Sequence, residues 1–186
     1  DRNNDGSHPA AVSDFAFDRF EVTVGRFRRF VTAWVGGWRP EAGSGKHAHL
    51  KSGGGLNGGG EPGWDTAWAT NLATTSGEWD AKLDCEATFA TWTPAPGASE
   101  TLPLNCLAWY EAYAFCIWDG GFLPSDAEWN YAAAGGMEQR VYPWSSPANS
   151  TAINCTYANY TPPTTACIAT GANGVGSESP KGDGKW

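Results

Sequence analysis

The segment from Gly120 to Gly136, GGFLPSDAEWNYAAAGG, constrains the fold of this chain more than any other stretch. Ser125, followed three residues later by Glu128, matches a capping box. In that motif the hydroxyl accepts a hydrogen bond from the first helical turn, and the carboxylate accepts one from the backbone of the cap. Leu123-Pro124 favours an extended approach, because proline disfavours helical backbone in the residue before it. With Gly135-Gly136 as a stop, the sequence predicts a short helix directly after Ser125.

The expected inner side of that helix consists mainly of small residues. Trp129, Ala132 and Ala133 share this side at helical spacing. Tyr131 and Trp144 are the large side chains expected to pack against the alanines. The segment therefore predicts a compact element whose role is structural.

Two further helices are predicted from the same kind of signal. Thr23 offers an N-cap oxygen, and apolar residues then recur at helical spacing until Gly36-Gly37, which predicts a helix over residues 24–35. A second helix is predicted over residues 109–118, with Gly120-Gly121 as its stop. The apolar residues of the first are Phe27, Phe30, Val31 and Trp34, opposite Arg26, Arg28 and Arg29 on its solvent side. The shared face of the second comprises Trp109, Tyr113, Cys116 and Ile117.

The rest of the chain carries weaker signals. Residues 15–22 alternate between apolar and polar side chains, which predicts a strand with one buried face. Between residues 36 and 103 no strong period appears, so packed coil with short helices or strands is expected, held by buried aromatic rings. Only Ser52 to Gly60 has the composition of a flexible tract. The tryptophans in these segments favour a core, with a carbohydrate-stacking surface as the alternative.

Composition limits the class of protein. A chain of 186 residues with 11 Trp and 41% hydrophobic residues can bury one core, so a single domain over residues 1–186 is expected. The formal net charge of -8 argues against nucleic acid and anionic membranes as partners. No apolar run approaches the roughly 20 residues that a membrane span needs. The only methionine is Met137, and the chain is expected to be a fragment of a longer protein.

Five cysteines in this acidic, glycine-rich chain favour disulfides and an oxidising compartment, either secreted or in the cell envelope. Cys155 and Cys167 are the best local pair, because both lie in a turn-rich stretch where a cross-link would replace missing core. Cys116 falls within a predicted helix and is a candidate core residue. The odd count fits either a further cysteine outside the chain or a buried thiol.

Several segments together resemble the formylglycine-generating enzyme family, also called sulfatase-modifying factor domains. The agreement in order and spacing extends from about Phe15 to Trp186. Its most specific part is Leu123 to Ala133, LPSDAEWNYAA. The other matching pieces are Glu21-Val22-Thr23, Pro103 to Trp109 (PLNCLAW), Glu111-Ala112, Ala114-Phe115-Cys116, Gly135-Gly136 and Tyr142-Pro143-Trp144.

The resemblance implies an α+β, C-type-lectin-like fold with little regular secondary structure, truncated here to a single incomplete domain. It implies copper- and oxygen-dependent oxidation of a cysteine in a sulfatase-type polypeptide to formylglycine. The family's copper is held by two cysteines in the C-terminal part of the domain, which none of the five cysteines matches. No catalytic residue is therefore assigned, and this monomeric, bacterial-type fragment is expected to be inactive. The alternative is a non-catalytic extracellular lectin-like domain for binding or scaffolding.

A structural calcium ion is also implied by the resemblance, near the segment Tyr157-Ala158-Asn159-Tyr160. The expected ligands are the side-chain oxygen of Asn159 and the backbone carbonyl of Tyr160, with Asn173 as a further donor. No acidic ligand is evident nearby.

Other possible sites have simpler interpretations. Asp1 to Gly6 matches half of a calcium loop, but Val12 stands where the closing Glu belongs, which favours a polar turn. His47-Ala48-His49 lacks a third metal ligand and is expected to be a solvated loop. The chain contains no HExxH, no GxSxG, no P-loop and no GxGxxG that is followed by a predicted helix, so the sequence supports no metalloprotease, serine hydrolase or nucleotide-binding function.

Overall fold

The computed structural model describes residues 11–47, 60–160, 167 and 171–177. Within these ranges the chain forms four α-helices and three short 3₁₀ helices. The α-helices are α1 (Val24–Val35), α2 (Ser76–Leu83), α3 (Trp109–Trp118) and α4 (Asp126–Ala133). The 3₁₀ helices are η3 (Thr66–Asn71), η4 (Ala98–Thr101) and η5 (Gly136–Glu138). Within the described ranges, strand-like pairing is limited to a single antiparallel bridge between Thr23 and Pro103.

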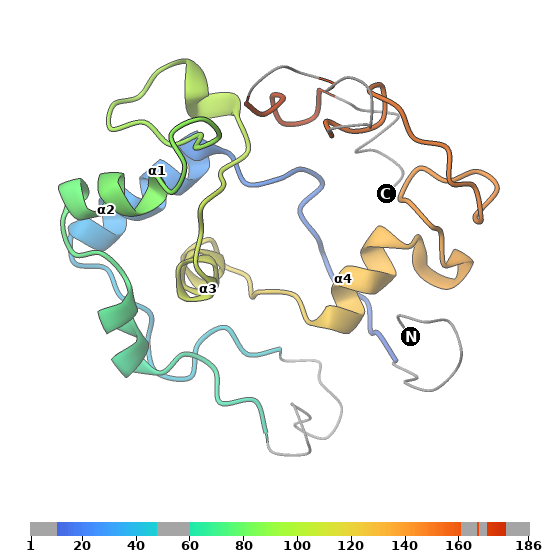
Figure 1. Cartoon of the computed structure of the whole chain (residues 1–186). Coiled ribbons are helices and arrows are strands. Elements are labelled where there is room, and N and C mark those ends of the chain that lie inside the picture. The colour runs from blue at the N-terminus through green and yellow to red at the C-terminus, as the bar shows by residue number, and fades with distance from the viewer. Residues whose placement is uncertain (1–10, 48–59, 161–166, 168–170, 178–186) are drawn as a thin grey trace. The chain divides into compact units, whose positions relative to one another are not determined.

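The chain divides into two compact units (Figure 1). Unit 2 is Thr23–Leu123 and contains α1, α2, α3, η3 and η4. Unit 1 combines Asp1–Val22 with Pro124–Trp186 and contains α4 and η5. A single domain over residues 1–186 stays a prediction.

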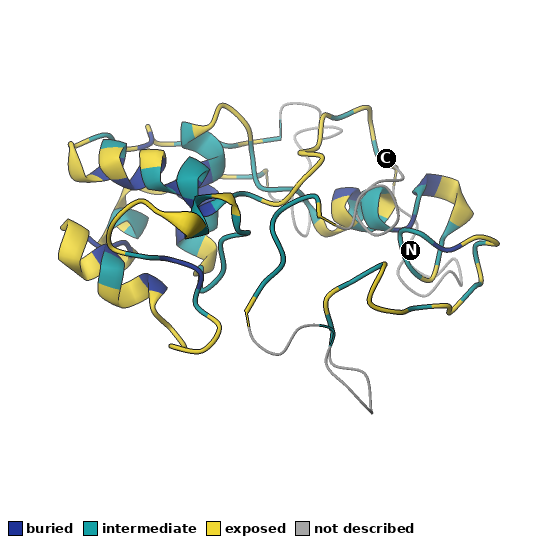
Figure 2. Cartoon of the chain, turned by 90° about the horizontal axis from the view of Figure 1, so that it is seen from above, coloured by how far each residue is buried: buried dark blue, intermediate teal, exposed yellow. Residues whose placement is uncertain are grey.

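Helix α1 has the bounds predicted from the sequence. The hydroxyl oxygen of Thr23 accepts a hydrogen bond from the backbone nitrogen of Arg26 at 3.1 Å, which confirms the N-cap. The predicted apolar face is buried, and in the view of Figure 2 the helices of this unit carry separate buried and exposed sides. Its buried residues are Val24, Phe27, Phe30, Val31 and Trp34.

Aromatic rings form the core of unit 2. The Phe27 ring lies 5.4 Å from that of Phe115 on α3 and 5.8 Å from that of Trp79 on α2, measured between centroids. The Trp34 indole nitrogen donates to the carbonyl of Ala73 at 2.8 Å, so this buried polar group is satisfied. Trp64 and Trp92 are buried as well. The interpretation as core is confirmed for Trp64, Trp79 and Trp92, whereas Trp38 and Trp68 are only half-buried.

Helix α3 also has its predicted bounds, but the predicted face is wrong in part. Trp109 is 51% exposed, whereas Ala114 and Phe115 are buried. The helix is covered on more than one side, because Phe115 stacks on Phe27 while Tyr113 stacks on Trp64. A single helical stripe does not describe such an element.

Helix α2 was not individually predicted, although the sequence contains its signal. Thr75 and Glu78 form a complete capping box, in which the Thr75 hydroxyl accepts from the Glu78 nitrogen and a Glu78 carboxylate oxygen accepts from the Thr75 nitrogen. The helix is short and begins with Ser76-Gly77, so it shows no strong apolar period. Its contribution to the core is Trp79 and Leu83, both fully buried.

In unit 1, the capping box at the start of α4 is confirmed. The Ser125 hydroxyl accepts from the Glu128 nitrogen at 3.3 Å, and the Glu128 carboxylate accepts from the Ser125 nitrogen at 2.7 Å. The predicted inner position of Trp129 is wrong, since this side chain is 58% exposed and its ring contacts Phe17. The capping geometry buries Glu128 and leaves the neighbouring indole outside.

The large partners predicted for the alanines of α4 also differ. Tyr131 is 44% exposed and lies edge-on to Phe15. The Trp144 ring stacks instead between Tyr142 and Tyr157, at centroid distances of 5.1 and 5.6 Å. Stacking within this turn-rich segment therefore determines the position of Trp144.

The predicted strand over residues 15–22 is absent, and the α+β class is not confirmed by the described residues. The ring centroids of Phe15 and Phe17 lie 6.2 Å apart, as those of alternate residues in an extended chain can. A strand also needs a partner for its backbone, and this segment has no ladder with other described residues. Alternation predicted the side-chain pattern but not the pairing.

Two disulfides cross-link the chain. Cys155–Cys167 confirms the local pair that the sequence favoured. Cys85–Cys106 closes a second loop, with a sequence separation of 21. Cys116, on α3, is half-buried and takes part in neither bond.

Candidate functional site

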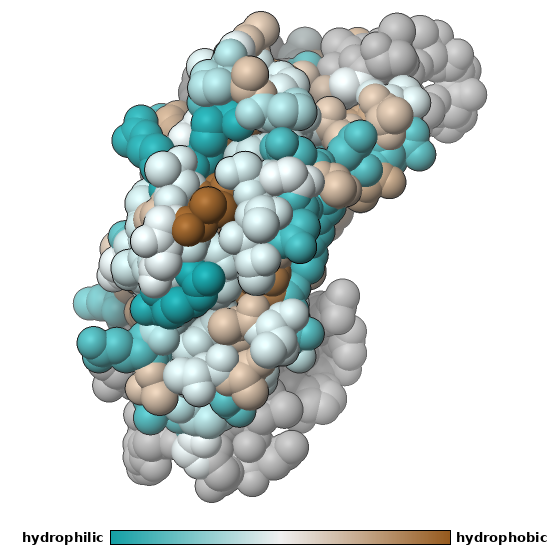
Figure 3. Space-filling model, turned by 90° about the vertical axis from the view of Figure 1, so that its left-hand side faces the viewer, coloured by the Kyte–Doolittle hydropathy of each residue, from teal (hydrophilic) through white to brown (hydrophobic). Residues whose placement is uncertain are grey.

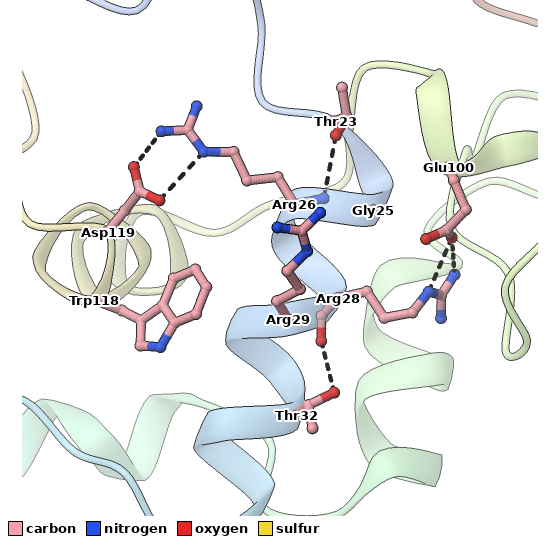
Figure 4. A pocket seen from close by; sticks show the side chains of 9 residues that line it. All are labelled: Thr23, Gly25, Arg26, Arg28, Arg29, Thr32, Glu100, Trp118 and Asp119. Atoms are coloured by element: carbon pink, nitrogen blue, oxygen red, sulfur yellow. Dashed lines mark hydrogen bonds and ion pairs between the residues drawn. The ribbon is translucent and has the colours of Figure 1, made fainter.

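The solvent side of α1 borders a cavity of about 630 Å³ within unit 2 (Figure 4). Its wall runs from the N-cap Thr23 along α1 to Thr32. Glu100 of η4 lies on one side, and Trp118 and Asp119 at the end of α3 lie on the other. We call this cavity the arginine groove, because Arg26, Arg28 and Arg29 all line it. The sequence placed these three arginines on the solvent side of the helix but did not predict the groove.

The tight packing of α1 against η4 forms one wall of the groove. The Val24 nitrogen donates to the carbonyl of Leu102 at 3.0 Å, which ties the first turn of the helix to the segment after η4. Gly25 makes this approach possible. A Cβ atom at that position would lie 2.9 Å from a carboxylate oxygen of Glu100 and 3.1 Å from its backbone oxygen.

Two arginines of the groove are held by carboxylates. Arg26 makes a two-pronged ion pair with Asp119, the residue that follows α3. Arg28 donates from Nε to Glu100 at 2.9 Å, and its guanidinium lies 4.2 Å from the centroid of the Trp92 ring. Each guanidinium is therefore fixed in place by a planar acidic partner.

Arg29 differs from its two neighbours. Its side chain is exposed, and its guanidinium makes no ion pair or hydrogen bond with the described residues. In Figure 4 it extends from α1 between the two ion pairs. The half-buried Trp118 adds an aromatic wall to the same groove and contacts Phe30 of the core. The groove thus combines an available cation with an apolar surface.

One face of the chain is shown in Figure 3. Hydrophilic and neutral surface dominates it, and strongly hydrophobic atoms occupy only small areas. None of the helices in the described part of the chain is long and apolar enough to cross a bilayer.

The residues predicted to bind calcium lie in unit 1. The Asn159 side-chain nitrogen donates to the carbonyl of Gly171 at 3.3 Å, and the Tyr160 carbonyl accepts from the Cys167 nitrogen at 3.1 Å. The described segments 153–160 and 171–177, which include Asn173, contain no carboxylate. Calcium takes six to eight oxygen ligands, usually with carboxylates among them. These residues alone do not complete such a site.

The histidine motif is described only at His47. Its ring nitrogen Nδ1 lies 2.9 Å from a carboxylate oxygen of Glu61, and the same carboxylate accepts from the His47 backbone nitrogen. The described residues contain no cluster of three or more His, Cys, Asp or Glu side chains that could hold a metal ion. Asp1 to Gly6, His49 and nearly all of the Ser52–Gly60 tract lie outside the described residues.

The cysteines of this chain do not fit a copper centre. A soft metal such as copper requires thiolate ligands, but four of the five cysteines are in disulfides. The fifth, Cys116, lies within α3. A thiolate pair is therefore not formed by the described residues.

The helices and their caps coincide with the segments that define a known family. The family model for the Sulfatase-modifying factor enzyme 1-like domain matches residues 1–181. The chain belongs to this family, which confirms the resemblance found in the sequence and implies the fold of formylglycine-generating enzymes.

Curated relatives match shorter stretches. Formylglycine-generating enzyme of Bos taurus is 36% identical over 61 residues, which is 30% of this chain and 16% of the relative. Inactive C-alpha-formylglycine-generating enzyme 2 of Bos taurus is 43% identical over 53 residues, 27% of this chain and 18% of the relative. Formylglycine-generating enzyme of Thermomonospora curvata is 43% identical over 53 residues, 26% of this chain and 18% of the relative. These matches span less than a fifth of each relative, and no solved structure matches the chain.

Proposed function

We propose that this chain forms the scaffold of a formylglycine-generating-enzyme-type domain, and that its parent protein oxidises a cysteine of a sulfatase-type polypeptide to formylglycine. The observation that carries the proposal is the family match over residues 1–181. Three helices support the proposal, because each begins in a segment that carries one of the family's motifs. The N-cap residues are Thr23 for α1, Ala108 for α3 and Ser125 for α4. The finer features of the family's fold, α+β and C-type-lectin-like, belong to the same proposal.

The chemistry itself requires groups from outside the described residues. In this family two cysteines would hold a copper ion, which would supply the chemistry for oxidising the substrate thiol. Because this chain shows no thiolate pair, its proposed contribution is to fold the shell that supports such a site. The 186-residue chain alone is therefore expected to be inactive.

We propose a non-catalytic function as the second candidate, because one of the relatives is named as an inactive enzyme. The relative named as an inactive C-alpha-formylglycine-generating enzyme 2 is 43% identical over 53 residues, the same identity and length as for the formylglycine-generating enzyme of Thermomonospora curvata. A non-catalytic, extracellular lectin-like domain that binds or scaffolds other molecules is compatible with this similarity. Two disulfides support secretion or a cell-envelope location for either function.

The deciding experiment uses the full parent protein, loaded with copper and supplied with oxygen. A peptide containing the Cys-x-Pro-x-Arg sulfatase motif serves as substrate, and mass spectrometry detects conversion of its thiol-bearing carbon to an aldehyde. A peptide with Ser in place of Cys is the control. Conversion of the cysteine peptide alone supports the oxidase. No conversion by a folded, copper-loaded protein supports the non-catalytic function instead.

A calcium ion near Asn159, Tyr160 and Asn173 stays part of the proposal as a structural cofactor. It requires additional oxygen ligands beyond the described residues of these segments. A monomeric state and a bacterial type of parent protein are likewise proposals.

A further inference from the structure

The arginine groove concentrates positive charge in an acidic protein. Three guanidinium groups, those of Arg26, Arg28 and Arg29, share it with two carboxylates, those of Glu100 and Asp119. Three positive and two negative groups leave one excess positive charge, in a chain whose formal net charge is -8. The local charge is therefore opposite in sign to that of the whole protein.

The excess charge is available to a ligand. Arg26 and Arg28 are engaged by Asp119 and Glu100, whereas the guanidinium of Arg29 has no charged or hydrogen-bonding partner among the described residues. It is exposed and borders a cavity of about 630 Å³, large enough for a small organic group. An arginine fork binds planar oxyanions through parallel hydrogen bonds.

We propose that the arginine groove binds a singly charged carboxylate, presented by a small organic acid or by an acidic side chain of a polypeptide. Arg29 supplies the cation, and one negative charge neutralises the excess in the groove. The two acidic partners already present in the groove are themselves carboxylates, each bound by one arginine. Trp118 offers an apolar wall for the methylene groups beside the carboxylate.

The charge balance also predicts selectivity. A phosphate dianion would leave the groove with a net negative charge beside Glu100 and Asp119, so a monocarboxylate is favoured. Because Arg29 is exposed, the affinity is expected to be weak, with a dissociation constant on the order of millimolar at low salt. Screening at higher ionic strength weakens it further.

The test is a titration of the 186-residue chain followed by NMR of the arginine side-chain Nε–Hε signals. The probes are N-acetyl-aspartate amide, a blocked peptide Gly-Gly-Glu-Gly-Gly with a single carboxylate, and inorganic phosphate, each at low ionic strength. Arg29→Gln removes the proposed cation. Arg39→Gln is the matched control, because Arg39 follows α1, does not line the groove and also removes one positive charge. Circular dichroism establishes that each variant is folded.

We expect the carboxylate probes to shift the Arg29 signal and to bind the Arg29→Gln variant roughly fivefold more weakly, while Arg39→Gln keeps its affinity. Tighter binding of the blocked peptide than of the amino-acid derivative would identify a polypeptide as the source, and equal binding a small acid. Three results overturn the proposal: no shift at Arg29 with any carboxylate, tighter binding of phosphate, or equal losses in the two variants. Each readout is independent of oxidase activity.

Discussion

The Nζ atom of Lys82 on α2 lies 3.1 Å from Oε1 of Glu111 on α3, and the Glu111 side chain is fully buried. The other carboxylate oxygen of Glu111 accepts from the Ala108 nitrogen at 2.7 Å, so one side chain caps its own helix and also faces the neighbouring one. A buried charge of this kind depends on its partner, because water cannot replace the lost interaction.

Replacement of Lys82 is expected to destabilise unit 2. Lys82→Met leaves the Glu111 carboxylate buried without a counter-charge and should lower the free energy of unfolding by about 2 to 3 kcal/mol. Glu111→Gln retains an acceptor for the Ala108 nitrogen and, combined with Lys82→Met, should recover part of the loss. Urea denaturation of the two single variants and the double variant measures this coupling. Purely additive losses would contradict a direct pair.

Gly25 and Gly77 provide a matched pair of substitutions, since each is the second residue of its helix. Gly25→Ala forces a Cβ atom against Glu100 and should lower stability by about 1 to 3 kcal/mol. Nothing lies within 4 Å of a Cβ atom at Gly77, so Gly77→Ala should raise stability by about 0.5 to 1 kcal/mol. Thermal unfolding distinguishes the two. The same sign for both variants would refute the close approach of α1 to η4.

The disulfide Cys85–Cys106 should be a principal cross-link of unit 2. Its sequence separation of 21 gives a loop-closure contribution of about 3 kcal/mol in the chain-entropy view. The double variant Cys85→Ala and Cys106→Ala is therefore expected to unfold at lower denaturant concentration. Cys116→Ala is the control, because it leaves both disulfides intact. An unchanged midpoint in the double variant would argue against this bond as a stabilising cross-link.

The capping box of α2 should make the folding stability of the chain depend on pH. Hydrogen bonds from the Thr74 side chain and from the backbone nitrogens of Thr74 and Thr75 lower the pKa of Glu78 from 4.5 to about 2. Because the pKa of Glu78 is lower in the folded state than in the unfolded state, its carboxylate stabilises the fold. This stabilisation is fully present above about pH 4.5 and is lost as the pH falls toward 2. The melting temperatures of the wild type and Glu78→Gln should therefore differ at neutral pH and converge in acid. A constant difference across this range would contradict the assignment.

Calcium is expected to raise the melting temperature if it binds only the folded chain. Asn159→Ala should abolish the increase, whereas Asn149→Ala, an exposed residue of the same unit, should retain it. Calorimetry with calcium and then with a chelator measures the effect. Identical transitions under both conditions would rule out the proposed site.

Local signals in the sequence were sufficient for three helices. The bounds of α1 and α3 and the capping box of α4 were predicted because caps and stops act over three or four residues. The same rule identifies α2 in retrospect, through Thr75 and Glu78. The Cys155–Cys167 bond was accessible for a similar reason, since only 12 positions separate its ends.

Burial was less predictable than helix position. Trp109 and Trp129 were both assigned to inner faces, yet more than half of each side chain is exposed. A helical period shows which residues share a side, but neighbours distant in the sequence determine which sides are covered. The prediction of a strand over residues 15–22 failed for the same reason. A strand needs a second strand to pair with its backbone, and alternating apolar and polar side chains do not show whether one is present.

By itself, then, the sequence determined the family, the start and end of α1 and α3, and the position of arginines along α1. Only the tertiary structure brought those arginines into a groove, because their carboxylate partners lie 93 and 72 positions away, in Asp119 and Glu100. Helix capping arises from neighbouring residues and can be read along the chain. A cavity arises from packing between distant segments, and its lining is decided when the chain folds.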